Sequence, residues 1–281
     1  MRRTRVNYNT IMNTQSFLRK TSTAKTGIVL GLLIVILIAA QVTAHLVQRD
    51  FGRVTVSNVK FTNENDVVVR AKLMEPVAAT GDSFPAVVFV HGYQNNRETS
   101  DAYCIELARR GFVVLNIDAV GRGNSGEPAH VESPDFDTTY GARSAVAYLR
   151  SLPHVRSDSI GLAGHSLGAE MAYEVALDDP GIAALLISGF AYTDKASFDR
   201  PRNMLMIIGK WDEFRDRMTG VDDIEAEWMS TAQTKSAIDH PAPEVGSTYG
   251  DFADGTARRG IIPPVIHVME SHSRYAIGEA L

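Results

Sequence analysis

The sequence predicts an α/β fold: a mostly parallel sheet of about eight strands, flanked by helices and preceded by one transmembrane helix. Three observations carry this prediction. Short runs rich in β-branched residues alternate with segments of helical periodicity, which is typical of parallel sheets with crossover helices. A glycine-rich turn at residues 164–168 joins one such run to a helix. A long apolar stretch near the N-terminus precedes the whole pattern.

The composition indicates one globular domain with an appendage. The chain has 281 residues, 44% of them hydrophobic, and is long enough to build one sizeable core. Its one cysteine, Cys104, excludes an internal disulfide and a cysteine-based zinc site, and its helical surroundings favour a buried structural thiol. The sequence contains no metal-ligand cluster and no phosphate-binding loop. We therefore expect no cofactor and no metal.

Charge is unevenly distributed along the chain. Six basic residues and no acidic ones precede residue 26, whereas the whole chain has a net charge of −5. Without those six positive charges, the remainder carries −11. Because binding to phosphates requires a basic surface, this acidic remainder argues against nucleic acid as a partner.

The apolar stretch predicts a membrane span over residues 26–47, which is about the length needed to cross a bilayer. The basic residues before it predict a cytoplasmic tail at residues 1–25 and place the folded domain, residues 48–281, outside the cytoplasm. The alternative is a cleaved signal peptide and a secreted protein, because Val42-Thr43-Ala44 has the small residues that a signal peptidase prefers. We favour the retained anchor, since the basic segment is long and the apolar run extends almost to that site.

Strands and helices follow in alternation along the rest of the chain. Residues 63–66 form a turn between the first two strands, which are expected to pair as an antiparallel hairpin. Residues 213–256 form a polar excursion before the last strand, suited to a lid or a partner surface. Strands are predicted at 53–61, 67–74, 85–90, 112–117, 158–163, 182–188, 203–209 and 258–263, and helices at 97–110, 137–151, 169–176, 224–238 and 274–281.

The turn Gly164-His165-Ser166-Leu167-Gly168 carries the most information about chemistry. A Gly-x-Ser-x-Gly turn between strand and helix is so sharp that the serine takes strained backbone angles, and glycines two positions away avoid a clash. The turn presents Ser166 Oγ above the sheet, where the helix directs its amide dipoles. We therefore predict Ser166 as a nucleophile. The side chain of His165 is expected to point away from it and to have a packing role.

Five motifs in order resemble those of the α/β-hydrolase fold superfamily, and they are most similar to its serine esterase, lipase and peptidase branches. They are Val90-His91-Gly92, Asp118-x-x-Gly121-Arg122-Gly123-x-Ser125, Gly164-x-Ser166-x-Gly168, Gly209-x-x-Asp212 and Pro263-x-x-x-His267. The resemblance covers residues 53–281. It implies the α/β-hydrolase fold, a serine–acid–histidine order along the chain, and a loop at 118–125 that borders the active site.

A serine hydroxyl becomes a good nucleophile only when a base takes its proton. By the order that the resemblance implies, the base follows the last strand, which makes His267 the predicted base. His272 abuts the predicted start of the last helix and is the alternative base. His240 lies in a polar, proline-rich loop and is expected at the surface.

The acid that orients the base should lie just beyond a strand that follows the elbow. Asp212 comes directly after the strand 203–209 and is the predicted acid, with Glu213 as the fallback. A tetrahedral intermediate also needs two backbone N–H donors. We predict those of Leu167, directly after the nucleophile, and of Tyr93, in the loop that Gly92 allows to approach closely.

These residues predict a membrane-anchored serine hydrolase that cleaves a carboxylic ester, a thioester or an amide through an acyl-enzyme. Its substrate would be a small-molecule or lipid acyl compound. Two alternatives stay open: an acyltransferase of the same fold that acts on a lipid or alcohol acceptor, and a non-catalytic hydrolase-like binding module. Completeness of the triad favours catalysis over the binding module. The identity of the substrate and the oligomeric state stay open.

Overall fold

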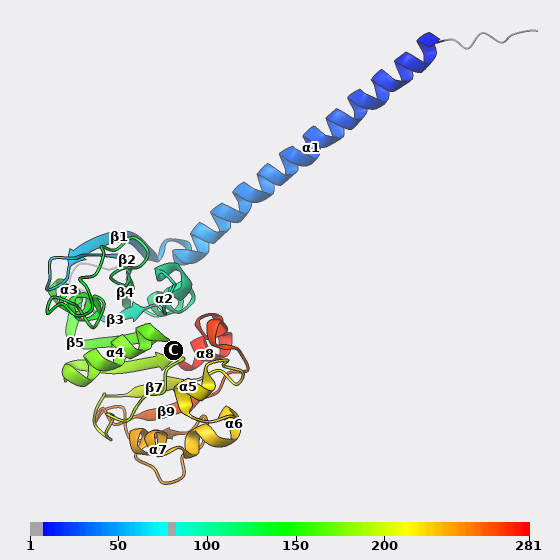
Figure 1. Ribbon diagram of the computed structural model, residues 1–281. Coiled ribbons are helices and arrows are strands. Elements are labelled where there is room, and N and C mark those ends of the chain that lie inside the picture. The colour runs from blue at the N-terminus through cyan, green and yellow to red at the C-terminus, as the bar shows by residue number, and fades with distance from the viewer. Residues whose placement is uncertain (1–7, 78–82) are drawn as a thin grey trace, which may run out of the picture. The chain divides into compact units, whose positions relative to one another are not determined.

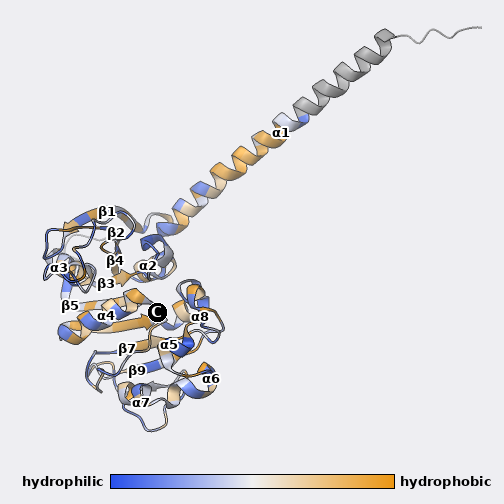
Figure 2. Cartoon of the chain, in the orientation of Figure 1, coloured by the Kyte–Doolittle hydropathy of each residue, from blue (hydrophilic) through white to orange (hydrophobic). Residues whose placement is uncertain are grey.

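The computed structural model describes residues 8–77 and 83–281, with side chains from residue 25 onward (Figure 1). The chain forms two compact units, Met1–Phe51 and Gly52–Leu281. The first contains α1 (Tyr8–Gln48), which is followed by a short 3₁₀ turn, η1 (Asp50–Gly52). Within α1, the segment Lys25–Gln48 contains an 18-residue window with a mean hydropathy of 2.6, and it is orange over much of its length in Figure 2. Its length and composition suit a membrane span, and a signal sequence would meet the same criteria. Nearly all of the predicted basic tail lies outside the described side chains.

The second unit is built on one sheet of nine strands in the order β1-β2-β4-β3-β5-β6-β7-β9-β8. The first two strands pair as the predicted antiparallel hairpin. The six strands β4, β3, β5, β6, β7 and β9, in their order across the sheet, pair in parallel. The sequence prediction missed β8, which has two residues. The strands are β1 (Val54–Thr62), β2 (Val68–Pro76), β3 (Phe84–Val90), β4 (Val113–Asp118), β5 (Val155–His165), β6 (Ile182–Ser188), β7 (Met204–Ile207), β8 (Thr248–Tyr249) and β9 (Arg258–Ile261).

Helices cover both faces of the sheet. On one face, α3 (Ala142–Ser151) and α4 (Leu167–Asp178) pack over the larger apolar core. On the other face, α2 (Asp101–Arg109) and α8 (Arg274–Glu279) close a smaller core, which includes the buried thiol of Cys104. Side chains of a central strand alternate between these two cores, so helices and apolar side chains lie on both faces of the sheet.

Two helices differ from their predictions for local reasons. The helix expected from residue 137 begins at Ala142, because the Asp137 carboxylate accepts the N–H groups of Thr139 and Gly141 in a turn. The helix expected over 224–238 is divided into α6 (Ile224–Glu227), the 3₁₀ turn η3 (Trp228–Ser230) and α7 (Ala232–Ile238). Thr231 makes this break, since it takes extended backbone angles and its hydroxyl accepts the N–H of Thr234.

The elements that position the site meet at one edge of the sheet. Parallel strands point their carboxyl ends to the same edge, so the segments that follow β3, β5, β6, β7 and β9 converge there. These segments include two 3₁₀ turns, η2 (Arg97–Ser100) after β3 and η4 (His267–His272) after β9. The excursion between β7 and β9 begins with α5 (Arg215–Thr219) and continues through α7, which contacts β9.

Candidate active site

Ser166 occupies a strained turn between β5 and α4. Its backbone angles are φ 54° and ψ −122°, a conformation that side-chain-bearing residues rarely adopt. A β-carbon on Gly164 would lie 2.3 Å from the carbonyl oxygen of Gly168, and one on Gly168 would lie 2.2 Å from that of Val90. Both glycines are therefore needed for the turn, as the sequence analysis expected.

The predicted acid and the predicted base contact each other. His267 donates a hydrogen bond from Nδ1 to Oδ2 of Asp212 at 2.8 Å, and both side chains are buried. The other carboxylate oxygen of Asp212 accepts the N–H of Phe214 at 2.7 Å, which fixes the carboxylate. With Nδ1 engaged as a donor, Nε2 of His267 is left to accept a proton. His267 and Ser166 line the same cavity, which has a volume of about 510 Å³.

The other candidates for acid and base are placed differently. Glu213 does not reach the imidazole: its carboxylate accepts the backbone N–H of His267 at 2.9 Å and so holds the main chain of the predicted base. His272, the alternative base, ends η4 with an exposed side chain and does not line the cavity. The ring of His240 packs on Tyr249, with ring centroids 4.5 Å apart. His267 itself begins η4 rather than lying in an irregular loop.

The two predicted oxyanion donors, Tyr93 and Leu167, also line the cavity. Leu167 is the first residue of α4, so its N–H has no partner within the helix. His91 fixes the loop of Tyr93: its Nδ1 donates to the carbonyl of Gly92 at 2.8 Å, and its Nε2 accepts the N–H of Ala119 at 3.1 Å. Burial lowers the pKa of His91, which suits the neutral ring that these two bonds require.

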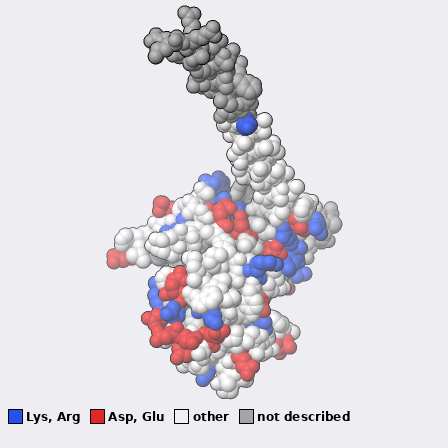
Figure 3. Space-filling model, turned by 90° about the vertical axis from the view of Figure 1, so that its right-hand side faces the viewer, with Lys and Arg blue, Asp and Glu red and all other residues white. Residues whose placement is uncertain are grey.

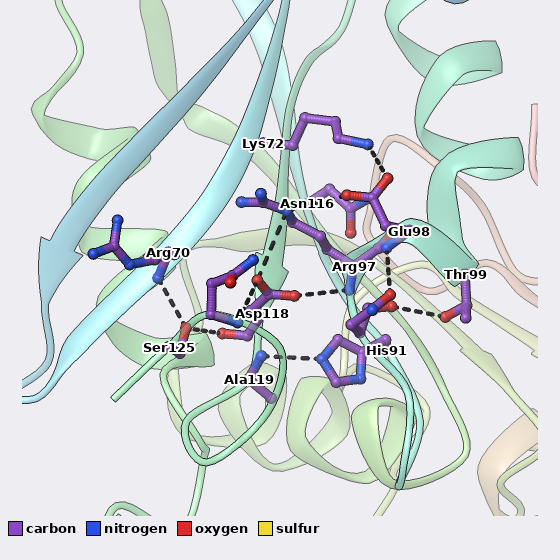
Figure 4. Close-up of polar contacts among 12 residues, drawn as sticks. Arg70, Lys72, His91, Arg97, Glu98, Thr99, Asn116, Asp118, Ala119 and Ser125 are labelled. Atoms are coloured by element: carbon purple, nitrogen blue, oxygen red, sulfur yellow. Dashed lines mark hydrogen bonds and ion pairs between the residues drawn. The ribbon is translucent and has the colours of Figure 1, made fainter. Parts of the chain in front are cut away.

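A polar network lies behind the loop that carries Tyr93 and joins it to β2 and β4 (Figure 4). Lys72, largely buried, binds Glu98 at 2.6 Å and Asp101 at 2.7 Å. The buried carboxylate of Asp118 accepts the backbone N–H of Arg97 at 3.0 Å. These contacts attach η2 and the start of α2 to two central strands. They support the loop from behind without entering the cavity.

The loop at 118–125 was expected to border the active site, but it lies behind the residues that line the cavity. Its residues do not line the 510 Å³ cavity. Instead the guanidinium of Arg122 lies over the ring of Tyr93, 4.8 Å from the centroid. The loop is itself held by Asp118, whose carboxylate also accepts the N–H of Asn124 at 3.0 Å. It therefore supports the predicted oxyanion loop.

Sequence reasoning missed Glu270, whose side chain is completely buried beside the Asp212–His267 pair. Oε1 accepts the N–H of Gly209 at 2.5 Å, and Oε2 accepts the hydroxyl of Ser188 at 2.9 Å. Glu270 follows His267 by three residues in η4. Side chains three apart eclipse in a 3₁₀ helix, so a His-x-x-Glu spacing would have been the signal had the 3₁₀ turn been predicted.

Gly189 was also missed. It directly follows β6 and has φ +62°, and a β-carbon there would lie 2.6 Å from Cε1 of His267 and 2.7 Å from Oε2 of Glu270. A glycine is therefore required at this position, because any side chain would displace the predicted base. Its place directly after a buried strand is the signal that the sequence offered.

His165, Glu270 and His267 have ligand atoms within 4.8 Å of one another, the spacing of a metal site. Their hydrogen bonds account for these atoms in another way. His165 donates from Nε2 to the carbonyl of His267 at 3.0 Å, His267 donates to Asp212, and Glu270 accepts from Gly209 and Ser188. The group therefore fits an internally hydrogen-bonded cluster better than a metal site.

The strand order, with the elbow after β5 and the Asp–His pair after β7 and β9, defines the chain as an α/β hydrolase. The chain belongs to the Hydrolase_4 family (serine aminopeptidase, S33), whose family model matches residues 81–240. The matched region contains Ser166 and Asp212, while His267 lies beyond it.

Curated relatives match part of the chain. The uncharacterized protein PA2218 of Pseudomonas aeruginosa is 33% identical over 132 residues, which are 46% of this chain and 35% of that protein. The 2,6-dihydropseudooxynicotine hydrolase of Paenarthrobacter nicotinovorans is 29% identical over 118 residues, which are 42% of this chain and 31% of that protein. The chain thus matches less than half the length of each relative.

Solved structures extend the likeness over most of the chain. The crystal structure of PA2218 has a TM-score of 0.56 at 18% identity and covers 81% of this chain and 91% of its own. An esterase of Pyrococcus furiosus has a TM-score of 0.55 at 17% identity and covers 80% of this chain and 88% of its own. At these identities the likeness shows the fold.

Proposed function

We propose that this α/β hydrolase is a serine hydrolase that cleaves carboxylic esters through an acyl-enzyme, with Ser166 as nucleophile, His267 as base and Asp212 as the acid that orients it. One observation carries the proposal: His267 donates to Asp212 at 2.8 Å and lines the same cavity as the strained Ser166. A serine in a strained turn beside a carboxylate-held imidazole has the chemistry of acyl transfer.

The geometry supports the following steps. Ser166 Oγ attacks the ester carbonyl carbon while His267 Nε2 takes its proton, and Asp212 stabilises the resulting imidazolium. The N–H groups of Leu167 and Tyr93 bind the oxyanion. The tetrahedral intermediate then collapses, and His267 returns the proton to the departing alcohol. In the second half, His267 activates a water that releases the acid from Ser166 by the same route.

The cavity favours an apolar substrate. Its lining includes the aromatic and aliphatic residues Phe190, Tyr192, Phe214, Met218 and Val268, together with the charged Glu170 and Arg217. Figure 3 shows one face of the molecule, on which acidic and basic side chains form separate clusters with uncharged side chains between them. We infer a small-molecule or lipid ester with an apolar acyl or alcohol group. Thioesters and amides would enter by the same chemistry.

We further propose that α1 anchors the protein as a single membrane span, with residues 1–25 in the cytoplasm and residues 48–281 outside it. The apolar segment Lys25–Gln48 and the basic residues before it support this arrangement. Carbonate washing of membranes that hold the full chain should leave it in the pellet. Mass spectrometry of the purified protein is the second measurement, and a mature N-terminus directly after Ala44 would show a cleaved signal peptide instead.

A fluorophosphonate probe tests the nucleophile. The folded wild type should be labelled, the Ser166→Ala variant should not, and Ser230→Ala, which changes an exposed serine, should be labelled as the wild type is. Absence of labelling in folded wild type would contradict the serine hydrolase and favour a binding module.

Product analysis separates hydrolysis from acyl transfer. Active protein is given an acyl ester in water with and without an alcohol. Free acid as the main product supports hydrolysis, whereas a new ester supports an acyltransferase.

A further inference from the structure

Glu270 is a buried carboxyl group beside the Asp212–His267 pair with no part in the proposed reaction, and its surroundings are unusual. Its side chain is completely buried. Among the described residues, no lysine or arginine forms an ion pair with it, and the nearest basic group is Nε2 of His165 at 3.6 Å. That nitrogen already donates to the carbonyl of His267. A buried carboxylate without a cation is strongly disfavoured, because it loses hydration and gains no opposite charge.

A neutral carboxylic acid fits this environment. Oε1 and Oε2 each accept one hydrogen bond, from Gly209 and Ser188, and a protonated carboxyl group can accept both and still donate one. Burial raises the pKa of Glu270 well above its ordinary value. The neighbouring Asp212 raises it further, through its charge and its closeness to the Glu270 carboxyl group, whereas the hydrogen bonds from Gly209 and Ser188 lower it. Both carboxyl groups are completely buried, but Asp212 has the imidazole of His267 as a partner, so Glu270 is the one expected to keep a proton.

We propose that Glu270 is a positioning residue that works as a neutral acid, donating its proton in a hydrogen bond to Asp212 and so holding that carboxylate toward His267. The inference rests on the proposed function, because it assigns Glu270 a part in the same reaction. Asp212 would then receive three hydrogen bonds, from Phe214, His267 and Glu270. Asp212 would keep its charge while it orients the imidazole.

The position of Glu270 in the fold suits this role. It belongs to the same short 3₁₀ turn as His267, and it reaches the ends of two strands through Ser188 on β6 and Gly209 after β7. A single side chain therefore joins the turn of the base to the segment that carries the acid. A β-carbon on Gly209 would lie 2.5 Å from the carbonyl oxygen of Val265 and 3.0 Å from Oε1 of Glu270, so a glycine is needed where Glu270 approaches the main chain.

The titratable groups that face Glu270 are Asp212, His165, His267 and Tyr103. Burial lowers the pKa of His165 to about 4, so that ring is neutral at neutral pH. Tyr103, on α2, donates its hydroxyl to the backbone carbonyl of Glu270 at 3.4 Å, and burial raises its pKa. Asp212 is the group whose charge raises the pKa of Glu270. When Glu270 loses its proton in alkali, two adjacent anions repel each other and the hydrogen bond to Asp212 is lost.

Two substitutions of Glu270 test whether it acts as a neutral hydrogen-bond donor or as a charged carboxylate. Glu270→Gln keeps the shape, the acceptor oxygen and a donor toward Asp212, so kcat at neutral pH should stay within roughly threefold of wild type. Glu270→Ala removes the donor and leaves Asp212 loosely held. It should lower kcat by about 10²-fold with little change in KM. The wild-type rate should fall in alkali as Glu270 ionises, and Glu270→Gln should lack that decline.

A spectroscopic measurement does not depend on activity. The infrared spectrum of the wild type at neutral pH should contain the carbonyl band of a protonated carboxylic acid, and the difference spectrum against Glu270→Gln should assign it. Absence of that band, or a loss of kcat in Glu270→Gln as large as in Glu270→Ala, overturns the inference. If the band is present but Ser166→Ala is as active as wild type, the proposed function fails while Glu270 is still shown to be neutral.

Discussion

The imidazole of His165 donates a hydrogen bond from Nε2 to the backbone carbonyl of His267 at 3.0 Å. The residue beside the proposed nucleophile thus holds the main chain of the proposed base, although 102 positions separate them in the sequence. The two rings pack with centroids 4.7 Å apart, and Nδ1 of His165 is buried and has no hydrogen-bond partner among the described residues. The elbow and η4 are therefore joined directly, which agrees with the supporting role expected for His165.

The neutral state of His165 predicts a loss of stability in acid. Burial, with a smaller contribution from His267, lowers its pKa in the folded protein to about 4, against about 6.5 in the unfolded chain. As pH falls through this window, the unfolded chain binds a proton that the folded protein does not. Stability should decrease by about 1.4 kcal/mol per pH unit from this group. In His165→Gln this slope should be absent. Urea unfolding from pH 4 to 8 measures the difference, and parallel stability curves would contradict it.

The two candidate bases can be distinguished by substitution. His267→Ala removes the group that contacts Asp212, and kcat should fall by about 10³-fold or more. His272→Ala changes an exposed side chain at the end of η4, and should leave the rate near that of wild type. Steady-state hydrolysis of one soluble ester compares them. A larger loss for His272→Ala would reverse the assignment.

Substitutions of the two adjacent carboxylates, Asp212 and Glu213, should also differ in their effect on kcat. Asp212→Asn puts an amide against Nδ1 of His267, which favours the wrong tautomer of the imidazole, so kcat should fall by about 10³-fold. Glu213→Gln keeps an oxygen that can accept the backbone N–H of His267, and should cost little. The pair is matched in chemistry and differs only in what each residue contacts. Equal losses in kcat would mean that Asp212 does not orient the base.

Gly189 should be required for activity more than for folding. In Gly189→Ala, the new methyl group would lie 2.6 Å from Cε1 of His267, so the ring must move and kcat should fall by about 10²-fold. Gly220→Ala is the control, because Gly220 also has a positive φ, +70°, and nothing lies within 4 Å of a β-carbon there. Both variants should lose about 1 kcal/mol of stability from backbone strain. An active Gly189→Ala enzyme would show that the ring is not confined.

Lys72 should stabilise the support behind the Tyr93 loop. Lys72→Met leaves Glu98 and Asp101 without their shared cation, and should cost about 1.5–3 kcal/mol of the free energy of unfolding. Lys195→Met breaks an exposed ion pair with Glu174 and should change stability little. Denaturant unfolding compares the two variants. A similar small change in both would mean that the network in Figure 4 is marginal to stability.

The sequence predicted the fold where local patterns decide it. All eight predicted strands are present, because β-branched runs between turn residues mark buried strands whatever their partners are. The missed strand, β8, has only two residues, Thr248 and Tyr249, and exists through pairing with β9. The late start of α3 depends on Asp137 bonds to particular backbone groups, which a periodic pattern does not reveal.

The candidate site could likewise be predicted only in part from the sequence. Ser166, Asp212 and His267 could be named because motif order and strand ends locate them, and their catalytic roles stay predictions. Glu270 could not be predicted from the sequence, because a glutamate in a polar segment is normally expected to be exposed. Its burial follows from the 3₁₀ turn η4 and from the convergence of the carboxyl ends of β6, β7 and β9, which the sequence does not reveal. The membrane orientation also stays a prediction.

The strand order has a consequence for biosynthesis. Ser166, Asp212 and His267 follow β5, β7 and β9, so the ribosome makes the nucleophile first and the base last. A nascent chain that has completed its elbow still has an unactivated serine, and it gains the proposed chemistry only when β9 joins β7 and brings η4 into place. The proposed hydrolysis therefore requires that β9 and η4 have been synthesised and have joined the sheet.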